Sequence, residues 1–280
     1  METFCTIDWI SFTDTEKQPG TGYLVPWYLN DQATTPTIPR FGYRKAVTTP
    51  LGNVIMWDGA TGTMGVHYQY NGRAITALMA AGVHPVSILV EHIEMGHRCS
   101  RLDLAIDVRG IHRFAQRLAM LAEMHKYRGT CRSIHIVRSV NDDGITTYCG
   151  SRQSERFARL YDKGVESGEG SDWARLEMEL KGDVARGVAR HLTSQQIGGL
   201  FLATKTLLTA LIDFDDDDWR DIMGGEGVPI TAPQIKERDT EKWLLTQVTI
   251  AIARYDKAHP ERDIWRQFID TVEALMRTAN

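Results

Sequence analysis

Acidic residues alternate with apolar ones along two segments that read as β-strands, and they are the first candidates for chemistry. In the segment RLDLAIDV, Asp103 and Asp107 lie on one face of a strand, and leucine, isoleucine and valine lie on the other. The segment WARLEMELK places Glu177 and Glu179 in the same way. If the two strands pair, the carboxylates form one cluster, where like charges raise each other's pKa unless a cation is bound. Hard oxygen ligands of this kind select Mg²⁺, Mn²⁺ or Ca²⁺.

The same alternation has a second interpretation, which needs no metal. Arg101 shares the polar face of the first segment, and Arg175 and Lys181 share that of the second. In an antiparallel sheet with one solvated face, these cations pair across the strands with the carboxylates. The two segments alone leave both interpretations open.

A third segment, RFARLYDK, adds a tyrosine among cations. Phe157, Arg159, Tyr161 and Lys163 alternate onto one face of a predicted strand. Two neighbouring cations favour a phenol pKa below the usual value of about 10, and they offer a place for a phosphate. Tyrosine is a covalent nucleophile in few chemistries, chiefly attack on a DNA phosphodiester, and a metal would polarise that phosphate. For the tyrosine alone, the simpler alternative is a half-buried strand residue whose hydroxyl is paired.

Taken together, these segments resemble the plasmid and phage rolling-circle replication initiation factors, the Rep-trans family. The resemblance rests on RLDLAIDV, YCGSR, RFARLYDK and RLEMELK, whose order, spacing and residue types agree over about 80 residues. Upstream, IDWISF and MGVHYQYNGRA look like the N-terminal half of phage-type members. Downstream, WLLTQV is similar to their C-terminal helical part. The chain has no histidine–hydrophobe–histidine motif, as the resemblance implies for a family whose sheet is like that of the HUH nucleases.

The resemblance implies an enzyme that nicks and rejoins DNA at one site on one strand. The family's nucleophile falls on Tyr161, which would attack the plus-strand origin to form a 5′-phosphotyrosine and free a 3′-hydroxyl primer. Arg159 and Lys163 would hold phosphates or help to ionise Tyr161. The divalent metal, Mg²⁺ or Mn²⁺, would be held by Asp103, Asp107, Glu177 and Glu179, with Asp103 and Glu177 as first choices. The residues expected to contact DNA are Arg101, Arg152, Arg156, Arg175 and Lys181.

The net charge of −4 on 280 residues argues against non-specific coating of nucleic acid, but the average hides an uneven distribution. Residues 101–190 hold 16 basic and 13 acidic residues, and 13 of the bases are arginine. Both flanking segments are net acidic. Arginine is favoured where planar contacts to phosphate or carboxylate matter, so we expect the chemistry in the middle segment and weak non-specific DNA affinity elsewhere.

The pattern of elements predicts an α+β fold, with a mostly antiparallel sheet flanked by helices and a helical C-terminal part. We expect an α+β catalytic DNA-nicking region over residues 1–183 and a helical region over residues 184–280. The acidic stretch DFDDDD reads as a solvated loop. Other predicted elements are a helix over 111–127, a hairpin over 131–149, a loop over 164–172, helices over 184–191 and 194–211, and a helix pair over 240–258 and 264–278.

Partners and location follow from motifs that the sequence has or lacks. No GxxxxGK[ST] motif occurs, so a host helicase would have to unwind the nicked origin. The expected ligands are a double-stranded origin and a single-stranded nick site, and the family resemblance suggests a homodimer. No apolar run reaches the ~20 residues that span a bilayer, and no signal peptide is expected. The lack of such a run argues against a membrane partner. Four scattered cysteines read as free thiols, which points to the cytoplasm.

Two other functions fit the same segments. One is a relaxase that nicks a transfer origin for conjugative mobilisation through the same chemistry. The other is an origin-binding repressor on the same fold that does not cleave DNA. An intact motif set is also compatible with a degenerate prophage relic.

Overall fold

The computed structural model describes residues 1–15, 34–141, 143–194, 199–225, 249–259 and 263–270. The chain divides into two compact units, Met1–Ala232 and Pro233–Asn280. The second unit contains α9 (Thr249–Ala258) and a helical segment over residues 264–270. These agree with parts of the predicted helix pair, and the remainder of that pair lies outside the described residues.

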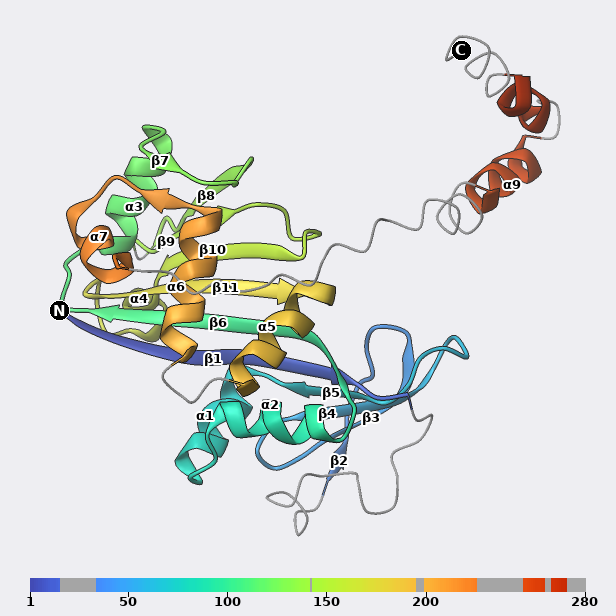
Figure 1. Cartoon of the computed structure of the whole chain (residues 1–280), viewed down its shortest axis with the longest axis horizontal. Coiled ribbons are helices and arrows are strands. Elements are labelled where there is room, and N and C mark those ends of the chain that lie inside the picture. Colours follow the sequence, from blue (N-terminus) through green and yellow to red (C-terminus); the bar gives the residue numbers. More distant parts are fainter. Residues whose placement is uncertain (16–33, 142, 195–198, 226–248, 260–262, 271–280) are drawn as a thin grey trace. The chain divides into compact units, whose positions relative to one another are not determined.

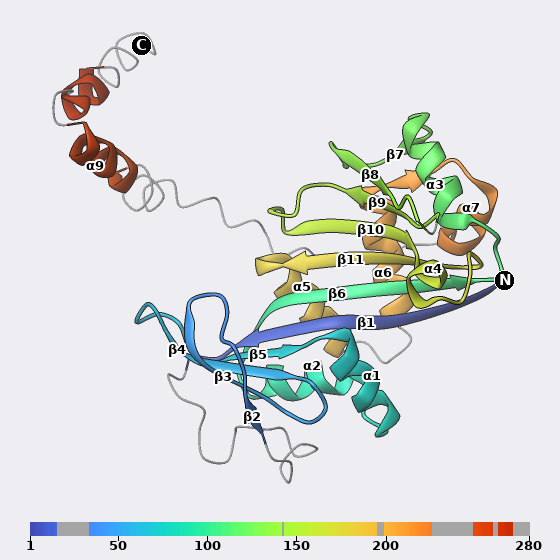
Figure 2. The ribbon, with the colours of Figure 1, turned by 180° about the vertical axis from the view of Figure 1, so that it is seen from behind.

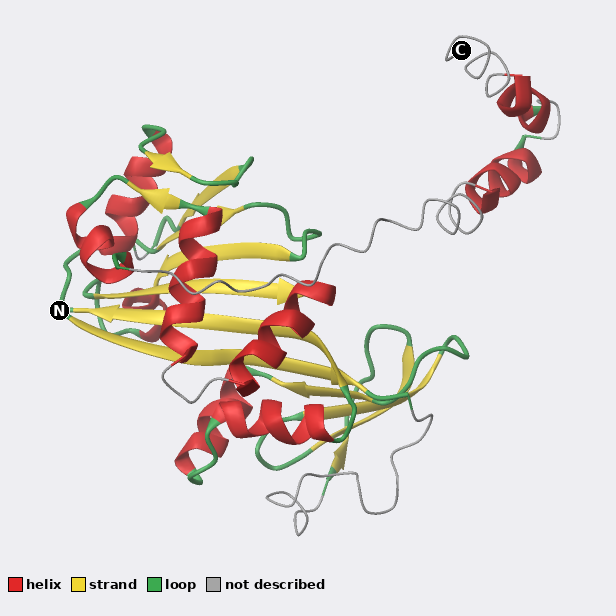
Figure 3. Cartoon of the chain, viewed as in Figure 1, coloured by secondary structure: helices red, strands yellow, loops and turns green. Residues whose placement is uncertain are grey.

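A ten-stranded sheet, antiparallel at every pairing, forms the centre of the first unit (Figures 1 and 3). In spatial order its strands are β2 (Thr35–Pro36), β3 (Tyr43–Thr48), β4 (Val54–Gly59), β5 (His67–Tyr70), β1 (Glu2–Thr13), β6 (Arg98–Arg109), β11 (Trp173–Lys181), β10 (Arg156–Asp162), β9 (Ile145–Cys149) and β8 (Ile134–Arg138). A second sheet pairs β7 (Tyr127–Arg128) with β12 (Asp213–Phe214). The predicted α+β class with an antiparallel sheet is confirmed.

The core lies on one face of the large sheet because the apolar residues of neighbouring strands are in register. Leu104 of β6 pairs with Met178 of β11, and Ile106 pairs with Leu176. All four are fully buried. Figure 1 shows α5 (Gly182–Ser194) and α6 (Gly199–Leu211) crossing this face, and Figure 2 shows the sheet from behind, with these two helices beyond it. The helices of the first unit are α1 (Gly72–Ala80), α2 (Pro85–Glu94), α3 (Phe114–Glu123), α4 (Lys163–Ser167), α5 (Gly182–Ser194), α6 (Gly199–Leu211) and α7 (Asp217–Met223).

Several predicted boundaries differ from the structure. The helix expected over 111–127 is shorter, because His125 has a left-handed backbone and the chain then enters β7. The loop expected over 164–172 begins with α4, whose first turn is capped by the Asp162 side chain. The compact unit extends well past the expected domain boundary at residue 183, because α5 and α6 bury leucines and alanines against the sheet.

The acidic stretch at 213–218 is not the solvated loop expected from its composition. Arg117 of α3 pairs with Asp216 at 2.8 Å and also with Asp218. The Asp216 side chain caps α7 by accepting from the backbone N–H of Trp219 at 3.0 Å. The stretch therefore attaches α7 to α3.

No single described helix is long and apolar enough to cross a membrane, and α1 and α2 would suffice only as a pair, across a bend of 103°. The four cysteines are free thiols.

Candidate active site

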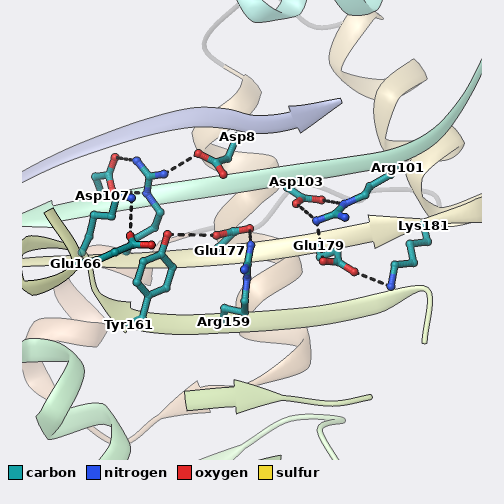
Figure 4. Close-up of polar contacts among 12 residues, drawn as sticks. Asp8, Arg101, Asp103, Asp107, Arg159, Tyr161, Glu166, Glu177, Glu179 and Lys181 are labelled. Carbon is teal, nitrogen blue, oxygen red and sulfur yellow. Dashed lines mark hydrogen bonds and ion pairs between the residues drawn. The ribbon is translucent and has the colours of Figure 1, made fainter. Parts of the chain in front are cut away.

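The polar face of the sheet brings the predicted site residues together from β6, β11 and β10, because the side chains of all three strands alternate in step (Figure 4). In one cross-strand row, Arg159 pairs with Glu177. In the adjacent row, Tyr161 pairs with Arg175, which in turn pairs with Asp107. Phe157, Glu179 and Asp103 form the row on the other side.

Tyr161 is half-buried, and its hydroxyl donates to Glu177 Oε2 at 3.5 Å. The other oxygen of Glu177 accepts from Arg159. Lys163, at the start of α4, lies 5.8 Å from the Tyr161 ring centroid and pairs with Glu166 at 2.6 Å. The predicted lowering of the Tyr161 pKa is wrong for these side chains. Burial raises the pKa of Tyr161 above its usual value, and the Glu177 carboxylate raises it further.

Asp8 of β1 joins the site through an irregularity that the sequence does not signal. The register of β1 against β6 shifts between Ile7 and Trp9. Counting back from Ile10 in strict alternation would put Asp8 on the core face. The irregularity adds a residue to β1 at this point, and such an extra residue turns the neighbouring side chain to the other face. The Asp8 carboxylate consequently accepts from Arg175 Nη1 at 2.6 Å.

Arg175 and Asp107 form a buried, two-pronged ion pair. Arg175 Nε and Nη2 donate to the two oxygens of Asp107 at 2.7 and 2.8 Å. The indole of Trp173 also donates to Asp107 at 2.9 Å. Arg175 was expected to contact DNA, but its guanidinium is buried between Asp107 and Asp8. Arg175 of β11 therefore links its strand to β6 and β1 through these ion pairs.

Arg101 forms a similar arrangement at the other end of the site. It donates to both oxygens of Asp103, at 2.9 and 2.6 Å, and to Glu179 at 2.9 Å. Its guanidinium lies 4.5 Å from the centroid of the Trp9 ring. Lys181 pairs with the second oxygen of Glu179 at 2.6 Å. The cross-strand pairing that the sequence offered as an alternative to a metal site is therefore present.

The pKa directions show where negative charge is least compensated. Burial raises the pKa of Asp103 to about 7, with further increases from Glu177 and Glu179 and an opposing effect from Arg101. Burial also raises the pKa of Glu177; the charge of Arg159 lowers it, and the charge of Asp8 raises it further. A cation bound beside Glu177 would lower the pKa of both carboxyl groups.

The acidic residues fit a divalent cation unequally. Within the described ranges, no three acidic, histidine or cysteine side chains form a ready-made metal-binding group. Both oxygens of Asp107 are taken up by Arg175 and Trp173. Glu177 lies beside Tyr161 and is affected by the charge of Asp8, and both carboxylates offer the hard oxygen atoms that Mg²⁺ and Mn²⁺ prefer.

His92, in α2, and His97, just before β6, form a buried network. His92 contacts His97 (Nδ1 to Nδ1, 2.8 Å) and the Tyr70 hydroxyl (2.8 Å), and it stacks on Phe12. Asp14 lies 3.6 Å from His97 Nε2. Burial lowers the pKa of His92 to about 3, so this ring stays neutral in the folded chain.

This network predicts a loss of stability in mild acid. Unfolding returns His92 to its ordinary pKa of 6.5, so the unfolded state takes up a proton that the folded state rejects. Between pH 7 and pH 5 the free energy of unfolding should fall by roughly 2 kcal/mol from this residue. Urea unfolding of His92→Gln at the two pH values should show a smaller fall than the unaltered chain. Equal falls in both proteins would contradict the assignment.

Comparison with known proteins places the chain in a known class. The family model of replication initiation factors (Rep_trans) matches residues 97–272, more than half of the chain, so the chain belongs to this family. Among solved structures, the rolling circle replication initiator protein from Geobacillus stearothermophilus is similar, with a TM-score of 0.65 and 18% sequence identity over 80% of this chain and 96% of that chain. No curated protein sequence matches. The fold is thus that of a rolling-circle initiator.

Proposed function

We propose that this replication initiation factor nicks and rejoins one strand of its origin through a covalent bond to Tyr161. The observation that carries the proposal is the hydrogen bond from the Tyr161 hydroxyl to Glu177, on the sheet face opposite the core. Membership of a replication initiator family implies a DNA ligand. A phenol beside a carboxylate is arranged for attack on a phosphodiester, whereas a binding protein needs no such pair.

In the proposed reaction, Glu177 Oε2 takes the proton from the Tyr161 hydroxyl as that oxygen attacks phosphorus. The new bond is Tyr161 Oη–P, and the bond that breaks joins phosphorus to the 3′ oxygen, which takes a proton from water and leaves as a 3′-hydroxyl. A raised phenol pKa makes this base necessary. Arg159 keeps Glu177 oriented.

Glu177 and Asp8 are the residues that we propose to hold Mg²⁺ or Mn²⁺. The other acidic residues expected as ligands already have both oxygens paired with donors of the protein; they are Asp103, Asp107 and Glu179. When bound, the cation would neutralise charge on the scissile phosphate. We propose that two arginines contact the DNA phosphates: Arg152, which precedes β10, and Arg156, its first residue. A homodimer is also proposed, on the family resemblance. The proposal of a host helicase rests on the lack of a GxxxxGK[ST] motif, and that of a cytoplasmic location rests on the scattered cysteines.

The test of this function uses a supercoiled plasmid carrying the DNA that flanks the gene in its source. We expect the purified full chain with Mn²⁺ or Mg²⁺ to convert the plasmid to open circles. A fraction of the protein should remain on the DNA in a denaturing gel. Specific binding without any nick in either metal would instead support an origin-binding repressor.

Glu177→Gln tests the proposed base. We expect nicking to fall by about 10²–10⁴-fold, because the amide cannot accept the phenol proton. Glu169→Gln is the matched control: this residue is exposed and pairs with Arg109, so its nicking rate should stay unchanged. Gel quantification of open circles measures both variants. Full activity of Glu177→Gln would rule out this base.

A further inference from the structure

A pocket of about 420 Å³ lies beside the site, on the strands β8, β9 and β10. Its lining includes His135, Tyr148, Arg152 and Phe157, and we call it the aromatic pocket. Arg152 is one of the proposed phosphate contacts, and the other three residues have no role in the proposed reaction. The pocket therefore needs an explanation of its own.

The aromatic pocket contains a stacked pair of rings. The centroids of Tyr148 and Phe157 are 5.8 Å apart, and their planes differ by 17°. The Arg152 guanidinium lies 5.1 Å from the Tyr148 centroid and 5.4 Å from the Phe157 centroid. Phe157 is buried, Tyr148 is half-buried and Arg152 is exposed. Within the described part of the chain, no carboxylate forms an ion pair with Arg152.

The register connects the aromatic pocket directly to the catalytic residues. His135 pairs with Tyr148, Tyr148 pairs with Arg159, and Arg159 pairs with Glu177. Tyr161 is two residues beyond Arg159 on the same strand, so it is a diagonal neighbour of Tyr148. Diagonal neighbours in an antiparallel sheet are about 7–8 Å apart. One continuous polar face therefore runs from Tyr161 into the aromatic pocket.

We infer that the aromatic pocket binds an unpaired DNA base next to the phosphate that Tyr161 attacks. Flat aromatic rings under a guanidinium offer stacking, which any base accepts, and the free charge of Arg152 suits the adjacent phosphate. A duplex base pair keeps its faces stacked on its neighbours, so the pocket takes bases only from a single strand. This inference rests on the proposed function, because it describes how the same substrate lies at the same site.

The experiment compares two fluorescein-labelled strands of about 12 nucleotides, a length within the usual site sizes. One is a thymidine homopolymer, and the other has the same backbone without bases. Fluorescence anisotropy with the full chain in EDTA measures binding without cleavage. Stacking of one base predicts roughly 5–150-fold tighter binding of the thymidine strand.

Tyr148→Val should remove most of this difference by weakening binding of the thymidine strand while leaving the abasic strand unchanged. Tyr43→Val is the matched control, since Tyr43 is also a half-buried strand tyrosine but lies on β3. If Tyr148→Val fails to fold, Tyr148→Ile replaces it, and the loss should again be confined to the thymidine strand. Equal affinity of the unaltered chain for both strands would overturn the inference.

The result also separates this inference from the proposed function. A base preference that depends on Tyr148 supports the pocket even if no nick is ever detected. Nicking through Tyr161 without any base preference would support the function and overturn the pocket.

Discussion

Tyr161→Phe should abolish nicking and the covalent protein–DNA adduct, with a loss of roughly 10⁴-fold or more, as expected for removal of a nucleophile. The phenol oxygen is the atom that bonds to phosphorus in the proposed reaction, and phenylalanine has none. The fold should survive, because the ring is kept and the hydrogen bond to Glu177 that is lost is a long one of 3.5 Å. The stability change should stay within about 1.5 kcal/mol, the usual range for one hydrogen bond.

The measurement pairs a denaturing gel for the adduct with a gel-shift assay for origin binding. Tyr127→Phe, on β7 of the small sheet, is the control and should nick normally. Retained binding with no adduct is the expected pattern for Tyr161→Phe. A remaining adduct in that variant would show that another residue is the nucleophile.

Arg175→Met should cost about 3–5 kcal/mol of unfolding free energy, the usual penalty for breaking a buried ion pair by removing one partner. The side chains of Arg175 and Asp107 are only 11% and 12% exposed. Methionine would leave Asp107 without its two-pronged partner and would release Asp8 from β11. Urea unfolding of the full chain measures the effect.

Arg138→Met provides the comparison for this prediction. Arg138 pairs with Glu123 at 2.7 Å, but both side chains are about half exposed, so its loss should cost less than about 1 kcal/mol. A similarly small effect for Arg175→Met would mean that this arginine is free to contact DNA after all, as its position in the sequence first suggested.

The central strands could be predicted because their pattern is local and strong. In β6 and β11, apolar residues alternate with charged ones over the site, with Ala105 as the exception on the polar face, so each strand, its buried face and its polar face follow from the period alone. The helices α5 and α6 were also predicted, but not their packing on the sheet. Packing depends on contacts between segments distant in sequence, and no local pattern encodes these.

The distribution of charge along the sequence located the site but did not show which arginines are free to bind DNA. The arginine-rich segment does contain the predicted site residues. Yet Arg101, Arg159 and Arg175 pair with carboxylates of the protein itself. Composition counts charges but does not show which are already neutralised by a neighbour, because that depends on strand register.

The sequence by itself determined the fold class, the polar face and the family to which the chain belongs, because residue type and a two-residue period are local properties. Only the tertiary structure decided what surrounds Tyr161. It brought Asp8 into the site through an irregularity in β1, enclosed Arg175 between two carboxylates, and placed the Tyr161 hydroxyl beside Glu177, so that its pKa rises instead of falling. These outcomes depend on strand pairing and burial, which bring together groups separated by up to 167 residues.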